Sequence, residues 1–258
     1  MKAILGLLSL YLAAWGIPVF AAGGIVQTGV KQSHFSAKPV TPRLRSGAVL
    51  VLAQDSGEPL FAKNVDQVMP IASISKLMTA MVVLDSGLPL LESIDIDKSD
   101  VDRKKGSRSK LQIGTTLMRA EMLKLALMAS ENRAAAALAR NFPGGTAAFV
   151  AAMNQKAAEL GMVNSHFDDP TGLTPDNVST AEDLAKMVAA AHTYPLIREY
   201  TTSDSFKIES EDRRRHRMLS YVNSNRLIKS RQWDIGLSKT GYISEAGRRL
   251  PPHERETV

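Results

Sequence analysis

The sequence predicts an α/β domain in which strands flank a block of helices, and three observations support this prediction. Residues 47–64 contain two short apolar runs separated by a turn, as in a β-hairpin. Residues 73–192 contain a series of apolar patterns with helical spacing. Residues 233–243 again have the pattern of a strand, and no internal repeat is visible.

The composition is that of a globular domain. The 258 residues are 44% apolar and 22% charged, which is enough apolar content for a substantial core. The formal net charge of +6 permits contact with an anionic polymer. The best local candidate is the basic run EDRRRHR at 211–217, but it has no flanking aromatic residues and no nucleic-acid-binding motif. We therefore expect a solvated face or loop there, and no nucleic-acid partner.

The first 21 residues have the features of a signal peptide. Lys2 precedes an uncharged apolar stretch that reaches Val19, and the small-x-Ala pattern ending at Ala21 predicts cleavage after that residue. A retained membrane anchor is the alternative, but the segment is short for a span and no basic residues follow it directly. We expect export, at most peripheral membrane association, and a flexible mature N-terminus over 22–46.

The chain contains no cysteine. This excludes thiol nucleophiles, disulfides and thiolate metal sites. Its five histidines form no HExxH motif, so we expect no metal site.

The first elements expected are a hairpin and a helix. Residues 47–54 form the first strand, DSGE turns the chain, and residues 59–64 form the second strand. From Ser73 onward, apolar residues recur with helical spacing as far as Leu84, and Gly87 is expected to end this helix.

Four later segments also have helical patterns, at 117–130, 131–142, 146–160 and 179–192. The third of these is expected to end at Gly161. The fourth begins with Ser179 and Glu182 in the spacing of a capping box. The last patterned segment, 233–243, is expected to be a strand.

Ser73 and Lys76 are the first candidates for chemistry. Residues i and i+3 share a helix face, so the Ser73 hydroxyl can lie beside the Lys76 amine. Free N–H groups in the first turn favour a developing oxyanion. A lysine is a base only when neutral, and at pH 7 a free lysine must give up roughly 4.6 kcal/mol to lose its proton. Burial and neighbouring groups must supply that energy, so the pair needs partners.

Two further motifs accompany the first S-x-x-K spacing. Ser130 and Asn132 end one helical run, and Lys239-Thr240-Gly241 lies on the expected strand. A second serine between two amines can relay a proton to a leaving amine, and an asparagine can hold a substrate's amide backbone. Lysine and threonine on a strand can receive a terminal carboxylate, and a glycine lets the substrate's backbone lie against that strand.

Two other matches compete with these motifs. A second S-x-x-K spacing, Ser107 to Lys110, lies in a basic, loop-like stretch with no apolar helix around it, and we interpret it as chance. Tyr221 and Asn223 match a Y-x-N variant of the middle motif. We prefer S-x-N at Ser130, because it follows the helical pattern expected of the second motif.

The motifs S-x-x-K, S-x-N and K-T-G in this order are the signature of penicillin-binding proteins and serine β-lactamases. From about Val40 to Gly247, the chain resembles a low-molecular-weight penicillin-binding protein of the D-alanyl-D-alanine endopeptidase type. The resemblance is carried by SGEPLFAKN, PIASISKLMTA, MASENRAA, DPTGL, NVSTAEDLA and GLSKTGY. It implies an α/β fold of the β-lactamase/penicillin-binding-protein transpeptidase type, an antiparallel sheet with a helical subdomain, with the peptidase domain over 47–247.

The resemblance also implies what each residue does. Ser73 would be the acylated nucleophile, Lys76 its base and Ser130 the proton relay. The substrate-binding residues would be Asn132, Lys239, Thr240, Gly241 and Tyr242, with the backbone N–H groups of Ser73 and Tyr242 as the oxyanion hole. The implied substrate is peptidoglycan peptide in the periplasm. The resemblance implies no metal or cofactor, and it implies β-lactams as covalent inhibitors.

Other activities stay open beside the endopeptidase. Class A β-lactamases deacylate with a glutamate in an ExxLN-type loop, and no ExxLN occurs here. Slow loss of a penicilloyl group, and hence sensitivity to penicillin, is therefore expected. The endopeptidase assignment rests only on overall likeness, so a D-alanyl-D-alanine carboxypeptidase is an alternative.

The segment 248–258 departs from the family pattern. Family members continue past the K-T-G strand with two more strands and a C-terminal helix, which we expect to be missing here. The tail LPPHERETV has two adjacent prolines and no apolar alternation, so we expect no sheet strand in it. Sheet edges would then be unpaired. A non-catalytic truncated fragment that at most binds peptidoglycan is therefore the second hypothesis.

Overall fold

The structure is a computed structural model that describes residue 44 and residues 46–103, 105–212, 215–230, 232–241 and 256–257. The predicted signal peptide, nearly all of the predicted flexible N-terminus, Tyr242 and most of the C-terminal tail lie outside the described residues. Within the described ranges, no helix is long and apolar enough to cross a membrane.

The first described element is the predicted hairpin. Strand β1 (Val49–Leu52) pairs antiparallel with β2 (Pro59–Lys63), with Val49 opposite Lys63. The turn between them is closed by backbone hydrogen bonds that join Ala53 to Gly57 and Glu58.

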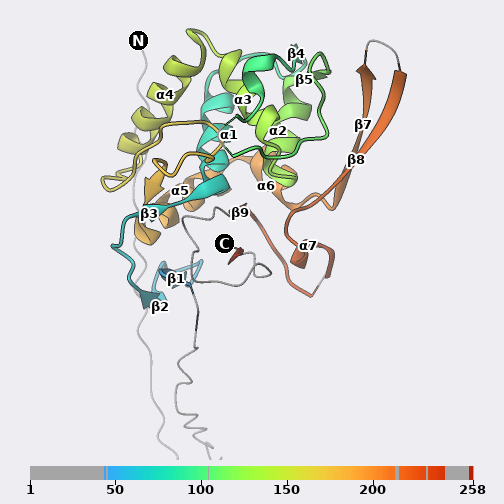
Figure 1. The fold of residues 1–258 in the computed structure, drawn as a ribbon. Coiled ribbons are helices and arrows are strands. Elements are labelled where there is room, and N and C mark those ends of the chain that lie inside the picture. The colour runs from blue at the N-terminus through green and yellow to red at the C-terminus, as the bar shows by residue number, and fades with distance from the viewer. Residues whose placement is uncertain are drawn as a thin grey trace, which may run out of the picture. The chain divides into compact units, whose positions relative to one another are not determined.

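Helix α1 (Ser75–Asp85) lies in the middle of the helical block, preceded by the 3₁₀ turn η1 (Ala72–Ile74). Its residues from Ser75 to Val83 are all buried, as expected of a helix that is apolar on most of its faces. Figure 1 shows the helices around it, and α1 contacts α2 (Arg119–Met128), α3 (Asn132–Arg140), α4 (Gly145–Glu159) and α5 (Ala181–His192). Helix α6 (Pro195–Thr202) packs against α2 and α5, and the short α7 spans Leu227–Ser230.

The other described strands form four more antiparallel pairs. They are β3 (Met69–Pro70) with β6 (Val178–Ser179), β4 (Ser93–Asp95) with β5 (Thr116–Met118), β7 (Ser205–Asp212) with β8 (Arg215–Val222), and β9 (Thr240–Gly241) with β10 (Glu256–Thr257). The β7–β8 hairpin reaches away from the helices in Figure 1. It holds the basic run, so residues 211–212 and 215–217 lie in strands rather than in a loop, while 213–214 lie outside the described residues.

Three predicted element boundaries are corrected by the structure. The helix expected from 117 begins at Arg119, because the residues before it pair with β4 as a strand. The N-cap of α5 is Thr180, whose side chain accepts a hydrogen bond from the N–H of Asp183, because Ser179 is engaged in β6. Of the strand expected over 233–243, only residues 240–241 are a strand in the described range.

The tail was expected to contain no sheet strand, and this was wrong for two residues. Glu256 lies opposite Gly241, and Thr257 lies opposite Thr240. Pairing of this kind uses backbone N–H and C=O groups, so it does not need apolar alternation in the sequence.

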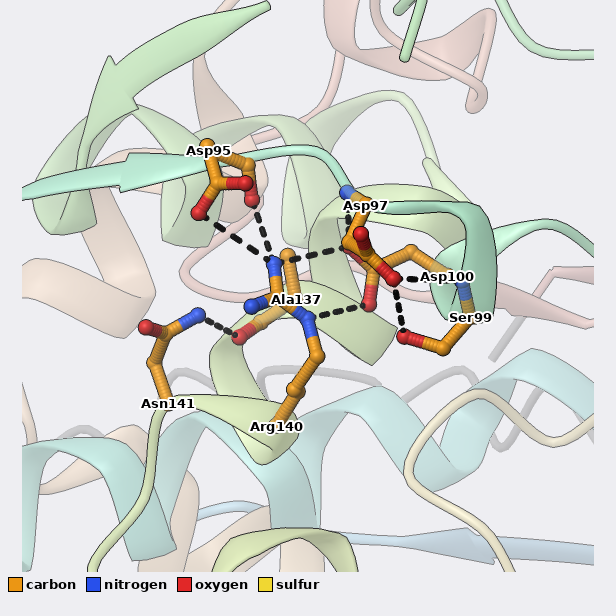
Figure 2. Close-up of polar contacts among 7 residues, drawn as sticks. All are labelled: Asp95, Asp97, Ser99, Asp100, Ala137, Arg140 and Asn141. Atoms are coloured by element: carbon orange, nitrogen blue, oxygen red, sulfur yellow. Dashed lines mark hydrogen bonds and ion pairs between the residues drawn. The ribbon is translucent and has the colours of Figure 1, made fainter. Parts of the chain in front are cut away.

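Figure 2 shows how the end of α3 is fastened to the segment after β4. Arg140 donates from Nε and Nη2 to the two carboxylate oxygens of Asp100, at 3.0 Å each, and from Nη2 to the carbonyl oxygen of Asp95 at 2.5 Å. Asp100 also accepts from the N–H of Asp97 and is buried. Bidentate guanidinium–carboxylate pairing is geometrically specific, so it fixes the 3₁₀ turn η2 (Lys98–Asp100), just before the segment that leads to Ser107.

Candidate active site

Ser73 lies in the η1 turn, one residue before Ile74 and at the N-terminal end of α1. The residue before it, Ala72, has φ of 50°, a left-handed conformation that costs a non-glycine residue about 1–2 kcal/mol. Strand β9 passes close to this turn, since a Cβ atom added to Gly241 would lie 3.2 Å from the carbonyl oxygen of Ile71. Backbone strain of this kind is often found at functional sites.

Lys76 points its amine at Ser73 from the first turn of α1. Its side chain is fully buried, and Nζ lies 2.9 Å from Ser73 Oγ, 2.7 Å from Asn132 Oδ1 and 2.6 Å from the carbonyl oxygen of Thr171. The two carbonyl oxygens can only accept hydrogen bonds. In a neutral amine they take both hydrogens, which leaves the nitrogen lone pair directed at the Ser73 hydroxyl.

The surroundings of Lys76 allow its amine to lose its proton near neutral pH. Burial lowers the pKa of Lys76 to about 7, against the opposing influence of the Asp169 and Glu131 carboxylates. The energy needed to deprotonate a free lysine at neutral pH is therefore largely supplied by the fold. Glu131 is itself buried, and burial raises its pKa.

The loop 169–174 presents the Thr171 carbonyl group to Lys76. One carboxylate, Asp169, accepts hydrogen bonds from the N–H groups of Thr171 and Gly172, at 2.5 Å each, and of Thr174, at 2.8 Å. Thr79 of α1 donates to the carbonyl oxygen of Pro170 at 2.7 Å, which joins the loop to the helix. The loop is therefore fixed both internally and against α1.

Asn177 joins the same loop to the start of α1. Its Nδ2 donates to Ser75 Oγ and to the carbonyl oxygen of Asp169, at 2.9 Å each, and its Oδ1 accepts from the N–H of Asp168 at 2.7 Å. The Ser75 hydroxyl in turn donates to the carbonyl oxygen of Ala72 at 2.8 Å. The turn that carries Ser73 and the loop that faces Lys76 therefore belong to one hydrogen-bonded unit.

Ser130 and Lys239 form a second pair of a hydroxyl and an amine. Lys239 is buried, and its Nζ donates to Ser130 Oγ at 3.0 Å and to the carbonyl oxygen of Thr240 at 2.8 Å. Burial, and to a smaller extent the charge of Lys76, lowers the pKa of Lys239 well below its usual value. Ser130 has φ of 56°, a second left-handed non-glycine residue at the site.

Ser224 connects this pair to the rest of the fold. Its N–H donates to the carbonyl oxygen of Met128, at the end of α2, at 2.9 Å. Its hydroxyl accepts from Thr240 Oγ1 at 2.7 Å. The K-T-G strand and the segment that carries Ser130 are thereby held at a fixed spacing.

The structure brings most of the predicted site residues together. Ser73, Lys76 and Asn132 form one set of contacts, and Ser130, Lys239 and Thr240 form another. Gly241 lies against the turn of Ser73. Tyr242 lies outside the described residues.

The residues of the two competing motif matches, Y-x-N at Tyr221 and S-x-x-K at Ser107, make different contacts from those of the predicted site. Asn223 donates from Nδ2 to the carbonyl oxygens of Thr201 and Ser203, at 2.9 Å each, so its amide hydrogens are used away from Lys76. Lys110 donates to the carbonyl oxygen of Ser220 at 2.7 Å, and Ser107 accepts from Asn132 Nδ2 at 3.1 Å. The Ser107–Lys110 match is therefore not a nucleophile–base pair, but Ser107 contacts a site residue, which the sequence interpretation did not foresee.

Sequence reasoning also missed the residues that hold the site from outside. They are Asp169, Thr171, Asn177, Ser224 and Ser107. The stretch DPTGL carries a local signal, because an aspartate two residues before a threonine and three before a glycine is typical of a side-chain-capped turn. Among the described residues, no group of three or more His, Asp or Glu side chains is placed to hold a metal ion.

Comparison with known proteins gives a consistent set of matches. The model of the peptidase S11 family, described as D-alanyl-D-alanine carboxypeptidase, matches residues 34–252. The chain is 48% identical over 212 residues to a D-alanyl-D-alanine endopeptidase of Pseudomonas aeruginosa, covering 82% of this chain and 68% of that protein. It is 45% identical over 210 residues to a D-alanyl-D-alanine endopeptidase of Escherichia coli, covering 81% and 67%.

A solved structure supports the same relationship. The Streptomyces K15 DD-transpeptidase aligns with a TM-score of 0.71 at 28% identity, over 80% of this chain and 84% of that one. This likeness confirms the predicted fold class.

Proposed function

The chain belongs to the peptidase S11 family of D-alanyl-D-alanine carboxypeptidases, and from this we propose that it is a serine D,D-peptidase that acts through an acyl-enzyme on Ser73. The observation that supports this most strongly is the position of Lys76, whose amine has two fixed acceptors and lies 2.9 Å from Ser73 Oγ. A buried lysine with a pKa of about 7 can accept the serine proton at neutral pH.

The acylation step follows from this geometry. Ser73 Oγ attacks the carbonyl carbon of the D-alanine residue that precedes the cleaved bond. The proton of the Ser73 hydroxyl passes at the same time to Lys76 Nζ. The N–H of Ser73, at the positive end of α1, would stabilise the developing oxyanion, with the N–H of Tyr242 as the second donor. The products of this half-reaction are an ester on Ser73 and a leaving group that still needs a proton.

Ser130 and Lys239 are suited to supply that proton. The Ser130 hydroxyl can pass its proton to the leaving amine as the C–N bond breaks, and it takes a proton back from the Lys239 ammonium group that donates to it. Lys239, directly before β9, and Thr240, on β9, would receive the substrate's terminal carboxylate, and the amide of Asn132 would hold its backbone. Water then attacks the Ser73 ester, which releases the shortened peptide and restores the serine hydroxyl.

Peptidoglycan peptide is the proposed substrate class, and the D-alanyl-D-alanine cross-link is the proposed bond. Two relatives at 48% and 45% identity are named endopeptidases, which favours cleavage of cross-links. The carboxypeptidase description of the family favours removal of a terminal D-alanine as the alternative. Penicillin would acylate Ser73 in place of the substrate. Residues 1–21 would direct export, so the reaction would take place in the periplasm.

A product analysis tests this function and separates the two activities. The full chain is incubated with a purified D,D-cross-linked muropeptide dimer and, separately, with a monomer that ends in D-Ala-D-Ala. Mass spectrometry is expected to show conversion of the dimer to monomers, and the Ser73→Ala variant is expected to show none. Release of D-alanine from the monomer alone would indicate the carboxypeptidase. Equal product from the wild type and Ser73→Ala would contradict the proposal.

A further inference from the structure

Ser107 lies in a segment that runs along the S-x-N motif. The hydroxyl oxygen of Ser107 accepts a hydrogen bond from Asn132 Nδ2 at 3.1 Å, across 25 positions of the chain. Arg133 donates from Nη1 to the carbonyl oxygen of Leu111 at 2.5 Å. Residues 107–111 thus contact Asn132 and Arg133, the first two residues of α3. We call this segment the 107–111 strap.

The strap is anchored on both sides of Ser107. Before it, the N–H of Ser107 donates to Asp102 Oδ2 at 2.8 Å, a short distance beyond the η2 turn that Arg140 fixes. After it, the Lys110 amine donates to the carbonyl oxygen of Ser220 on β8 and lies 5.1 Å from the centre of the Tyr221 ring. Hydrogen bonds on both sides of Ser107 therefore restrain its position.

The contact with Ser107 gives the side-chain amide of Asn132 a second hydrogen-bond partner. Asn132 Oδ1 accepts from Lys76, and one Nδ2 hydrogen goes to Ser107, which leaves one hydrogen for a substrate carbonyl. With a partner at each end, the amide plane cannot rotate out of the site. Because Asn132 is one of the two carbonyl acceptors of Lys76, a fixed amide also keeps the amine lone pair directed at Ser73.

We propose that Ser107 is a positioning residue for the peptidase reaction: its hydroxyl holds the Asn132 amide against Lys76. The inference rests on the proposed function, and it assigns Ser107 no contact with the reacting atoms. Loss of one neutral hydrogen bond is worth about a three- to tenfold change in rate when its partner acts in the transition state. The expected effect of Ser107→Ala is a fall of that size in the rate of acylation.

A double-mutant cycle separates positioning from general damage. The second-order rate constant for acylation by a fluorescent penicillin is measured for the wild type, Ser107→Ala, Asn132→Ala and the double variant. If Ser107 acts through Asn132, Ser107→Ala lowers the rate in the wild type and has no further effect in Asn132→Ala. Ser107→Thr keeps a hydroxyl and is expected to recover most of the rate. Ser56→Ala, at the exposed turn of the β1–β2 hairpin, is the control and is expected to leave the rate unchanged.

Each outcome decides the question. Additive effects of the two alanine substitutions, or equal rates for Ser107→Thr and Ser107→Ala, would overturn the inference while the proposed function stands. Absence of acylation in a wild-type chain that unfolds cooperatively on heating would overturn the proposed function, and this inference with it.

Discussion

Among single residues, two buried amines have the largest influence on the proposed reaction. Burial lowers the pKa of Lys76 to about 7, while Asp169 and Glu131 act in the opposite direction. Burial and the charge of Lys76 both lower the pKa of Lys239. Two amines with lowered pKa values, each beside a serine hydroxyl, are suited to take a proton at one serine and return it through the other.

The pH dependence of acylation tests this arrangement. In the proposed mechanism the neutral form of Lys76 is the base, so the rate of penicillin acylation is expected to rise with pH through about 7 and to level off above it. The Glu131 anion raises the pKa of Lys76, so Glu131→Gln is expected to move the midpoint of this profile to lower pH. Glutamine can still accept the hydrogen bond from the N–H of Arg133 that caps α3.

The matched control for this profile is Glu159→Gln, at the exposed end of α4, which should leave the midpoint unchanged. A midpoint that stays in place or moves to higher pH in Glu131→Gln would contradict the assignment of Lys76 as the titrating base.

At the scale of elements, the turn of Ser73 and the loop 169–174 are built against each other. Gly172 has φ of 75°, and a Cβ atom on it would lie only 1.8 Å from the carbonyl oxygen of Ala72. That carbonyl group also accepts from the Ser75 hydroxyl at the start of α1. Only glycine allows the loop to approach so closely, and this approach brings the Thr171 carbonyl oxygen within 2.6 Å of Lys76.

Gly172→Ala is therefore expected to disturb both elements at once. Gly87 makes a matched control, because it has φ of 65° and nothing within 4 Å of an added Cβ atom. Gly87→Ala should cost only the left-handed strain of about 1–2 kcal/mol in urea unfolding. Gly172→Ala should cost more, since the clash adds to the strain, and should also lose penicillin labelling. Equal unfolding midpoints with normal labelling for both variants would contradict this role of Gly172.

The sequence was sufficient for elements and motifs that depend on local spacing. The hairpin around 55–58, α1 and the placement of Lys76 beside Ser73 follow from patterns only a few residues long. The β7–β8 hairpin was missed, although Phe206 and Ile208 alternate with polar residues, because charged positions dominate its far end. The contact of Lys76 with Thr171 joins residues 95 positions apart, and no local pattern predicts which loop carbonyl group will meet the amine.

At the scale of the whole molecule, the site exists only after distant segments have packed together. Lys76 contacts Asn132 across 56 positions, and Lys239 contacts Ser130 across 109 positions. Lys76 lies on α1 and Asn132 on α3, and Figure 1 shows α1 among the other helices of the block. Long-range contacts of this kind form late and cooperatively, so covalent reactivity at Ser73 reports on the assembled fold as well as on the local chemistry.

In the proposed mechanism Ser73 is a nucleophile that Lys76 activates within this assembled site. Its most direct test is intact-protein mass spectrometry after incubation with benzylpenicillin, followed by peptide mapping of the adduct. We expect one penicilloyl group per chain, located on Ser73, with none on Ser73→Ala and a severe loss on Lys76→Ala. An adduct on Ser130 or Ser107, or equal labelling of the wild type and Ser73→Ala, would contradict it.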